Sequence, residues 1–191
     1  KRIQRKNGTD GCNRYIISHA EDIFSVLFVF SLLRWCGWGK GDVPVDIIPL
    51  FESMAGMQNA GSIMQALFDI PQYRAHVAQR RNRQTIMLGF SDGTKDGGFL
   101  QANWSIYTTK ERLSAVCDDY GIQAVFFDGR GGPPARGGGK THRFYASHGK
   151  KIANHAIQFT IQGQTITSMY GTKAHFKHNC EQLLTAGLST R

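Results

Sequence analysis

Apolar residues along the chain alternate between short runs typical of strands and longer segments with helical spacing. The short runs are rich in β-branched and aromatic residues and end in polar ones, a pattern that favours strands. They predict five strands, over residues 15–18, 45–51, 85–91, 122–127 and 157–161. The runs VDIIPLF and TIMLGF are apolar on both faces, as the buried strands of a parallel sheet are.

The longer segments predict four helices, over residues 20–35, 62–81, 100–120 and 173–184. The first is apolar nearly all round, which predicts a buried helix. Successive strand ends lie roughly 35 residues apart, the length of a βα unit. A complete eight-fold barrel takes about 250 residues. We therefore expect an α/β fold that forms part of a TIM-type β/α barrel, with four to five parallel strands and connecting helices.

Charge is concentrated in the last third of the chain. The 191 residues carry 23 Lys and Arg against 14 Asp and Glu, and residues 129–191 hold 9 of those bases and only one acid, Glu181. This excess predicts an anionic ligand or an acidic partner surface. A basic module that binds RNA or another polyanion is the alternative, although no RNA- or DNA-binding signature is present.

Targeting signals and cysteine spacing bear on the compartment. The longest apolar run is too short to span a membrane, and the opening KRIQRKNGTDGC has no initiating methionine and no secretory signal. We expect a piece of a longer protein or a processed product. The four cysteines form no CxxC pair, which predicts reduced thiols in a cytoplasmic protein.

Candidate metal ligands follow two of the predicted strands. Ligands of α/β folds bind at the carboxyl ends of parallel strands, and Glu52 and Asp92 each come directly after one. Paired carboxylates suit Mg²⁺ or Mn²⁺, which prefer oxygen ligands. The alternative is that either carboxylate merely caps the next helix.

A glycine-rich segment, DGRGGPPARGGGKTH at residues 128–142, carries two regularly flanked arginines, Arg130 and Arg136. Arginine grips phosphate or carboxylate with a planar fork of donors, so the segment predicts a mobile clamp for such a ligand. A flexible linker is the alternative. A nucleotide-binding phosphate loop is excluded, because the GxxxxGK[ST] spacing needs a glycine where Pro134 stands. His148, His155, His175 and His178 show no ligand spacing and are expected at the surface.

The segments IMLGFSDGTKDGG (86–98) and FDGRGGPPARGGGKTH (127–142) resemble the two most distinctive central motifs of bacterial-type phosphoenolpyruvate carboxylases. The stretches YIIS, IIPLFE and IQGQTI agree, so the resemblance spans nearly the whole chain. It implies a central fragment, residues 1–191, of a large enzyme built around a β/α barrel. The family is usually tetrameric, and a fragment is expected to be inactive alone, without the remainder of the enzyme chain.

The resemblance also implies chemistry: phosphoenolpyruvate and bicarbonate give oxaloacetate and phosphate, through carboxyphosphate and the enolate of pyruvate. It places Glu52 and Asp92 as ligands of Mg²⁺ or Mn²⁺ and Arg130 and Arg136 as catalytic. Substrate binding is expected from those arginines together with Lys95, Gly131, Gly137 and Gly138. Neither nucleic acid nor a membrane is an expected partner.

One departure from the family pattern concerns Asp128, which stands where many members have a histidine before GRGG. An aspartate beside two arginines could orient one of them.

Overall fold

The computed structural model describes all residues except 39–42, 131–138, 154, 162 and 189–191. Five strands form one sheet in chain order, and every neighbouring pair is parallel. The strands are β1 (Arg14–Ile17), β2 (Asp46–Phe51), β3 (Arg83–Gly89), β4 (Gln123–Gly129) and β5 (Ile157–Phe159). The predicted α/β class with four to five parallel strands is confirmed. The sheet is open, as a partial β/α barrel would be.

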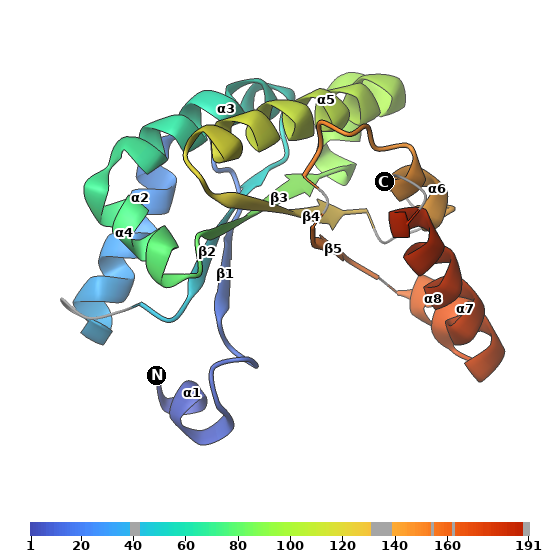
Figure 1. Cartoon of the computed structure of the whole chain (residues 1–191), viewed down its shortest axis with the longest axis horizontal. Coiled ribbons are helices and arrows are strands. Elements are labelled where there is room, and N and C mark those ends of the chain that lie inside the picture. The colour runs from blue at the N-terminus through green and yellow to red at the C-terminus, as the bar shows by residue number, and fades with distance from the viewer. Residues whose placement is uncertain (39–42, 131–138, 154, 162, 189–191) are drawn as a thin grey trace.

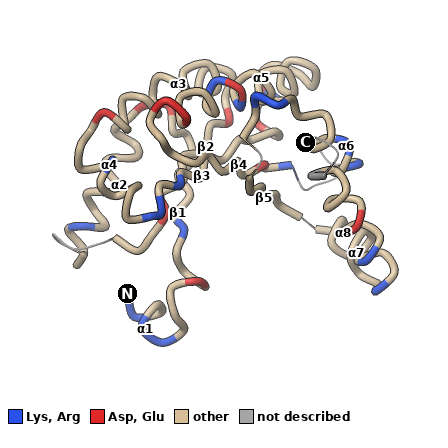
Figure 2. The backbone as a smooth tube through the Cα atoms, in the orientation of Figure 1, with Lys and Arg blue, Asp and Glu red and all other residues tan. Residues whose placement is uncertain are grey.

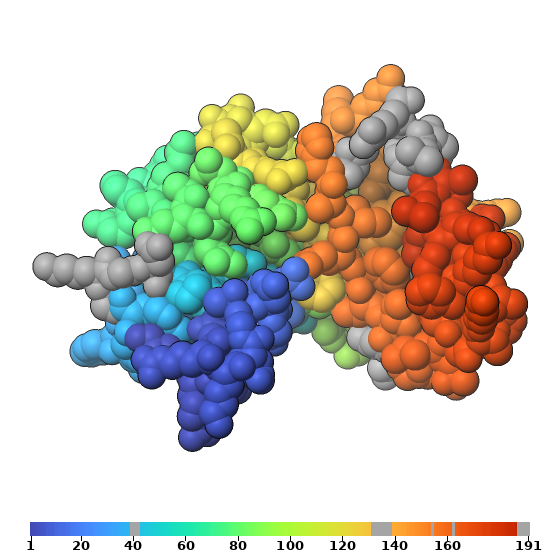
Figure 3. Space-filling model, turned by 60° about the horizontal axis from the view of Figure 1, so that its bottom comes forward, coloured from blue at the N-terminus to red at the C-terminus, as the bar shows by residue number. Residues whose placement is uncertain are grey.

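The helices connect and flank the strands. Helices α2 (Ile23–Leu33), α3 (Met54–Asp69), α4 (Pro71–Gln79) and α5 (Ser91–Asp119) lie together on one side of the sheet, as Figure 1 shows. The C-terminal helices α6 (Thr141–Ala146), α7 (Gln164–Tyr170) and α8 (Lys173–Leu188) gather beyond β5, and Figure 3 shows them as an orange and red lobe. A short helix α1 (Arg2–Asn7) precedes β1, and a π-helical turn, η1 (Arg34–Trp38), follows α2. None of the helices in the described ranges is long and apolar enough to cross a membrane.

The sheet curls so far that its two edge strands approach each other. Arg14 lies on β1 and Gln158 on β5, at opposite ends of the strand order. With its amide oxygen turned toward Arg14, Gln158 accepts hydrogen bonds from both terminal nitrogens of the guanidinium, at 2.7 and 3.0 Å. A contact between the first and last strands requires the curvature of a barrel wall, because a flat sheet would hold them about four strand spacings apart.

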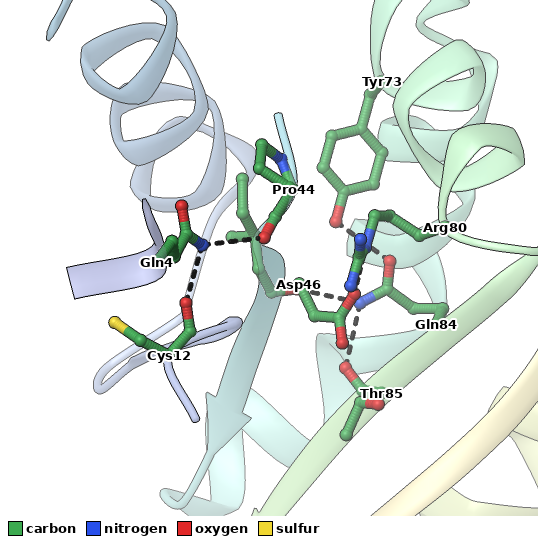
Figure 4. A network of polar contacts seen from close by, with 9 residues as sticks. Gln4, Cys12, Pro44, Asp46, Tyr73, Arg80, Gln84 and Thr85 are labelled. Atoms are coloured by element: carbon green, nitrogen blue, oxygen red, sulfur yellow. Dashed lines mark hydrogen bonds and ion pairs between the residues drawn. The ribbon is translucent and has the colours of Figure 1, made fainter. Parts of the chain in front are cut away.

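A polar network fixes the amino-terminal ends of the strands, opposite the candidate site (Figure 4). The buried Gln84 of β3 donates to the carbonyl of Ile47 on β2 and accepts from the hydroxyl of Tyr73 on α4, each at 3.0 Å. Arg80, at the end of α4, pairs with Asp46 at the start of β2. The bonds of Gln84 and Tyr73 satisfy polar groups that would otherwise be buried without partners.

Two predicted helices have different bounds in the structure. The helix predicted over 62–81 is two helices, α3 and α4, because Ile70 adopts an extended conformation before Pro71, as residues before proline do. The helix predicted over 100–120 begins earlier, at Ser91, and is interrupted at Gly98, whose φ of 78° is not helical. The helix predicted over 173–184 is confirmed within α8, whereas α1, α6 and α7 were not expected.

The prediction that the first apolar helix is buried was wrong for one face. Val26 and Phe30 of α2 are buried in the core, but Phe24 and Phe28 are 70% and 66% exposed. Trp35, in the turn that follows, is 86% exposed. None of the described elements packs over these three side chains, so a helix that is apolar on all sides has only one side covered.

Candidate functional site

The candidate site lies at the carboxyl ends of β2, β3 and β4, which we call the rim. Leu88 and Gly89 of β3 pair with Asp128 and Gly129 of β4, and Phe51 of β2 pairs with Leu88. The residue that follows each strand therefore reaches the same edge of the sheet. Ionisable side chains at the rim include Glu52, Asp92, Lys95, Asp96, Asp128 and Arg130, with His19 beside Glu52 and Lys110 behind Asp128.

The structure brings the two predicted metal ligands, Glu52 and Asp92, together. The pKa of Asp92 is lowered mainly by its hydrogen bond from Lys95, and the neighbouring Glu52 carboxyl group adds to this shift. The backbone N–H of His19, which follows β1, donates to Glu52 at 3.1 Å. Glu52 packs directly on Gly89 of β3, where an added Cβ would lie 2.6 Å from the Glu52 Cβ. The close approach of β3 to Glu52 therefore requires glycine at this position.

This carboxylate pair fits a hard divalent cation in part. In the described ranges, no group of three or more His, Cys, Asp or Glu side chains is placed to hold a metal ion. Mg²⁺ nevertheless often binds through one or two carboxylates while keeping several waters. Glu52 and Asp92 supply that minimum, and the exposed Asp92 stays ionised because the Lys95 ammonium lies 2.7 Å from it. The same ion pair occupies Lys95, which was expected to bind substrate.

Arg130 is the one loop arginine within the described residues, and it reaches the rim. Its guanidinium stacks over Phe144 of α6, 3.7 Å from the ring centroid, and lies 5.6 Å from the ring of Phe90. Phe90 is buried between the end of β3 and Asp92. Arg130 therefore lies at the same edge of the sheet as the carboxylate pair, since Gly129 pairs with Gly89. The other loop residues predicted to bind substrate, Arg136, Gly131, Gly137 and Gly138, lie outside the described residues, as does most of the segment predicted to be mobile.

Asp128 does not orient an arginine through a hydrogen bond that the structure describes. Its side chain is buried and pairs with Lys110 of α5, whose ammonium lies 2.7 Å from Oδ1 and 2.9 Å from Oδ2. The hydroxyl of Tyr145 on α6 donates to Oδ2 at 2.9 Å. Burial lowers the pKa of Lys110 and Asp128 opposes that shift, while burial and Asp128 together raise the pKa of Tyr145.

Sequence reasoning missed Lys110, Tyr145 and the ring of Phe144. A signal for the lysine was present, because Lys110 occupies an apolar-stripe position of its helix, four residues after Ile106 and three before Leu113. His148 was expected at the surface, yet it is half-buried against Phe144 and Tyr145. Burial, helped by the nearby Lys110 charge, lowers the pKa of His148 to about 4.

Comparisons with known proteins agree with the two sequence motifs. The family model described as phosphoenolpyruvate carboxylase matches residues 1–191. A phosphoenolpyruvate carboxylase of Nitrosomonas europaea is 38% identical over 98% of this chain, and one of Mycobacterium leprae is 36% identical over 96%. The chain spans about a fifth of the length of these curated relatives, 21% and 20%.

Among solved structures, RipC from Yersinia pestis is similar, with a TM-score of 0.51 over 89% of this chain and 69% of RipC. At 15% sequence identity this likeness concerns the fold alone. The family is shown by the model match along the entire chain and by curated relatives above 30% identity. This chain belongs to the phosphoenolpyruvate carboxylase family.

Proposed function

We propose that this chain supplies part of the active site of a carboxylase that converts phosphoenolpyruvate and bicarbonate to oxaloacetate and phosphate. The observation that carries the proposal is the placement of Glu52, Asp92 and Arg130 at the carboxyl ends of three neighbouring parallel strands, along one rim. Bicarbonate attacks phosphorus to give carboxyphosphate and the enolate of pyruvate. Carboxyphosphate then releases carbon dioxide, which the enolate captures. Each step moves negative charge among oxygens, which fixed cations stabilise.

Glu52 and Asp92 would hold Mg²⁺ or Mn²⁺. When bound, such an ion supplies Lewis-acid stabilisation of negative charge on a substrate oxygen. Lys95 keeps Asp92 ionised and hence able to act as a ligand. Because Glu52 is fixed by Gly89 beneath it and by the His19 N–H, its carboxylate is oriented before any ligand arrives.

Arg130 would bind oxygens of the phosphate or of carboxyphosphate. Its guanidinium is held by stacking on Phe144, and stacking leaves the N–H donors at the guanidinium edge available to an anion. Arg136 would act beside it from the glycine-rich segment 128–142, whose glycines Gly131, Gly137 and Gly138 would let the backbone approach the ligand. Lys95 would contribute further positive charge at the rim.

The chain would work as one piece, residues 1–191, of a cytoplasmic homotetramer and would be inactive without the remainder of the enzyme. The apolar side chains exposed on α2 support this, because Phe24 and Phe28 are covered by no described element. Figure 2 shows several blue Lys and Arg segments in the region of α6, α7 and α8. In the sequence of residues 129–191 the one acidic residue is Glu181. Part of this positive charge would face acidic surfaces elsewhere in the enzyme rather than a nucleic acid.

The test uses the full-length enzyme that carries this chain, with oxaloacetate formation and direct Mn²⁺ binding as readouts. Glu52→Gln and Asp92→Asn should each weaken Mn²⁺ binding, while Arg130→Ala should leave Mn²⁺ binding intact and lower kcat/KM by about 10²- to 10³-fold. Glu181→Gln, which removes an exposed carboxylate on α8, is the control and should change neither. Unchanged Mn²⁺ affinity in both carboxylate variants would refute the metal assignment, and an unchanged rate in Arg130→Ala would refute the role of the arginine.

A further inference from the structure

Three elements meet at a buried polar cluster behind the rim: Lys110 of α5, Asp128 at the end of β4 and Tyr145 of α6. All three side chains are buried. Asp128 directly precedes the glycine-rich part of the segment, and Tyr145 lies on the helix that follows it. The bonds from Asp128 to Tyr145 and Lys110 therefore tie together the two ends of the loop that carries the arginines.

Stability alone explains this cluster poorly. Removing a carboxylate and an ammonium from water costs several kcal/mol for each ion, and apolar side chains of similar volume are often as stabilising as a buried ion pair. The Lys110 ammonium is further surrounded by rings, 4.9 Å from the Phe144 centroid and 5.4 Å from that of Phe126. These contacts with aromatic faces offset part of the cost. The ion pair is therefore better explained by a role in placing charge than by a gain in folding free energy.

The charges in the cluster do not cancel. Lys110 and Arg130 are two cations, and among the described residues Asp128 is the carboxylate that interacts with both. Lys110 occupies both carboxylate oxygens, at 2.7 and 2.9 Å, and Tyr145 shares Oδ2. Arg130, whose pKa is lowered by burial and raised by Asp128, is left against the rings of Phe144 and Phe90. The carboxylate closest to the loop is thus held by a lysine instead of by the loop arginine.

We propose that Lys110 is a positioning residue for the carboxylation reaction: by holding Asp128, it leaves the Arg130 guanidinium free to bind the anionic substrate. The inference rests on the proposed function, because it assumes that Arg130 binds phosphate or carboxylate oxygens. Without Lys110, Arg130 is the described arginine whose charge still interacts with the buried Asp128 carboxylate. A salt bridge between them would use the donors that the substrate needs and cancel the positive charge that attracts it.

The experiment compares three variants of the full-length enzyme: Lys110→Met, Asp128→Asn and the double variant. Kinetics are measured at varied phosphoenolpyruvate, with the folded fraction determined for each protein. Lys110→Met should raise the KM for phosphoenolpyruvate and lower kcat/KM by about 10- to 100-fold. The double variant has no carboxylate to capture Arg130, so it should recover to within about threefold of the wild type. Lys177→Met, which breaks an exposed ion pair on α8, is the matched control and should leave the kinetics unchanged.

A purely structural role for Lys110 would lower the active fraction, and with it kcat, without changing KM. Wild-type kinetics in Lys110→Met, or a double variant as impaired as Lys110→Met, would overturn the inference. If Lys110→Met does not fold, the double variant decides by the same threefold criterion. A wild-type enzyme that forms no oxaloacetate would overturn the proposed function and this inference with it, whereas an active wild type with an unaffected Lys110→Met overturns the inference alone.

Discussion

The buried His76 of α4 predicts a loss of stability at acid pH. Its side chain is 4% exposed, packs 5.1 Å from the ring of Phe30 and 6.0 Å from that of Tyr73, and its Nδ1 has no hydrogen-bond partner among the described residues. Burial lowers the pKa of His76 from 6.5 to about 4, and the nearby Arg80 charge adds to the shift. In the folded protein the imidazole is therefore neutral at pH values where an unfolded chain would protonate it.

The sign and the size of the effect follow from this difference. The unfolded chain takes up a proton near pH 6.5 and the folded one near pH 4, so protonation stabilises the unfolded state between those values. The folded state therefore has its full stability above pH 6.5 and loses stability as the pH falls toward about 4. Since one pKa unit corresponds to about 1.4 kcal/mol, His76 should cost the protein about 3 kcal/mol of unfolding free energy over this range.

The assay is urea denaturation at several pH values for the wild type and His76→Leu. Leucine removes the titrating group and the unsatisfied Nδ1, so the variant should gain on the wild type by about 3 kcal/mol between pH 7 and pH 4. Comparing this gain across pH removes any constant effect of altered packing. Gln79→Leu places an apolar side chain at an exposed position of the same helix and should show no gain. A difference between His76→Leu and wild type that stays constant with pH would refute the reasoning.

Two further substitutions test the core and the rim. Leu67→Ala opens a cavity at a completely buried position of α3 and should lower the unfolding free energy by about 2 to 5 kcal/mol, whereas Leu184→Ala, at a side chain that is 70% exposed, should change it by less than about 0.5 kcal/mol. Equal losses in urea denaturation would contradict the assigned core. Gly89→Ala places a methyl group against Glu52 and should weaken Mn²⁺ binding by the full-length enzyme, while Gly11→Ala, which has open space around it, should not. Unchanged Mn²⁺ affinity in Gly89→Ala would show that Glu52 is not held by this contact.

The strands were the most predictable part of the fold. Each predicted strand overlaps an observed one within a few residues, because a parallel strand covered on both faces produces a continuous apolar run. The βα spacing then fixed their parallel order. Helix ends were less predictable, since they depend on single residues: Pro71 divides one predicted helix, and Gly98 interrupts another. Hydrophobic periodicity is a property of a whole segment and does not show where a single residue ends a helix.

The α2 face shows a limit of a different kind. An apolar pattern predicts that a surface is buried, but it does not identify what the surface packs against. Phe24 and Phe28 repeat at helical spacing as core residues do, yet both are exposed in the described chain. A sequence pattern therefore cannot separate burial within the chain from burial against something else.

In the candidate site, too, some positions could be predicted from the sequence and others could not. Glu52 and Asp92 could be predicted because position after a strand determines where a side chain lies in an α/β sheet. Lys110 lies in the middle of a long helix, and its partner is 18 residues away in sequence. Only the packing of α5 against β4 brings the two together. The available signal was a cation within an apolar stripe, because burying an ammonium group costs free energy unless a carboxylate pairs with it.

The strand order agrees with the role proposed for Lys110. Because β3 and β4 are neighbours, Asp92 and Asp128 lie along the same rim as Arg130, which is proposed to bind an anion. Two carboxylates near one guanidinium would neutralise it and repel the substrate. Each carboxylate instead has its own ammonium partner, Lys95 at 2.7 Å from Asp92 and Lys110 at 2.7 Å from Asp128. In the proposed function, the exposed pair would exchange Lys95 for a metal ion, whereas the buried pair would persist. That difference would keep Arg130 available while leaving Asp92 free to become a ligand.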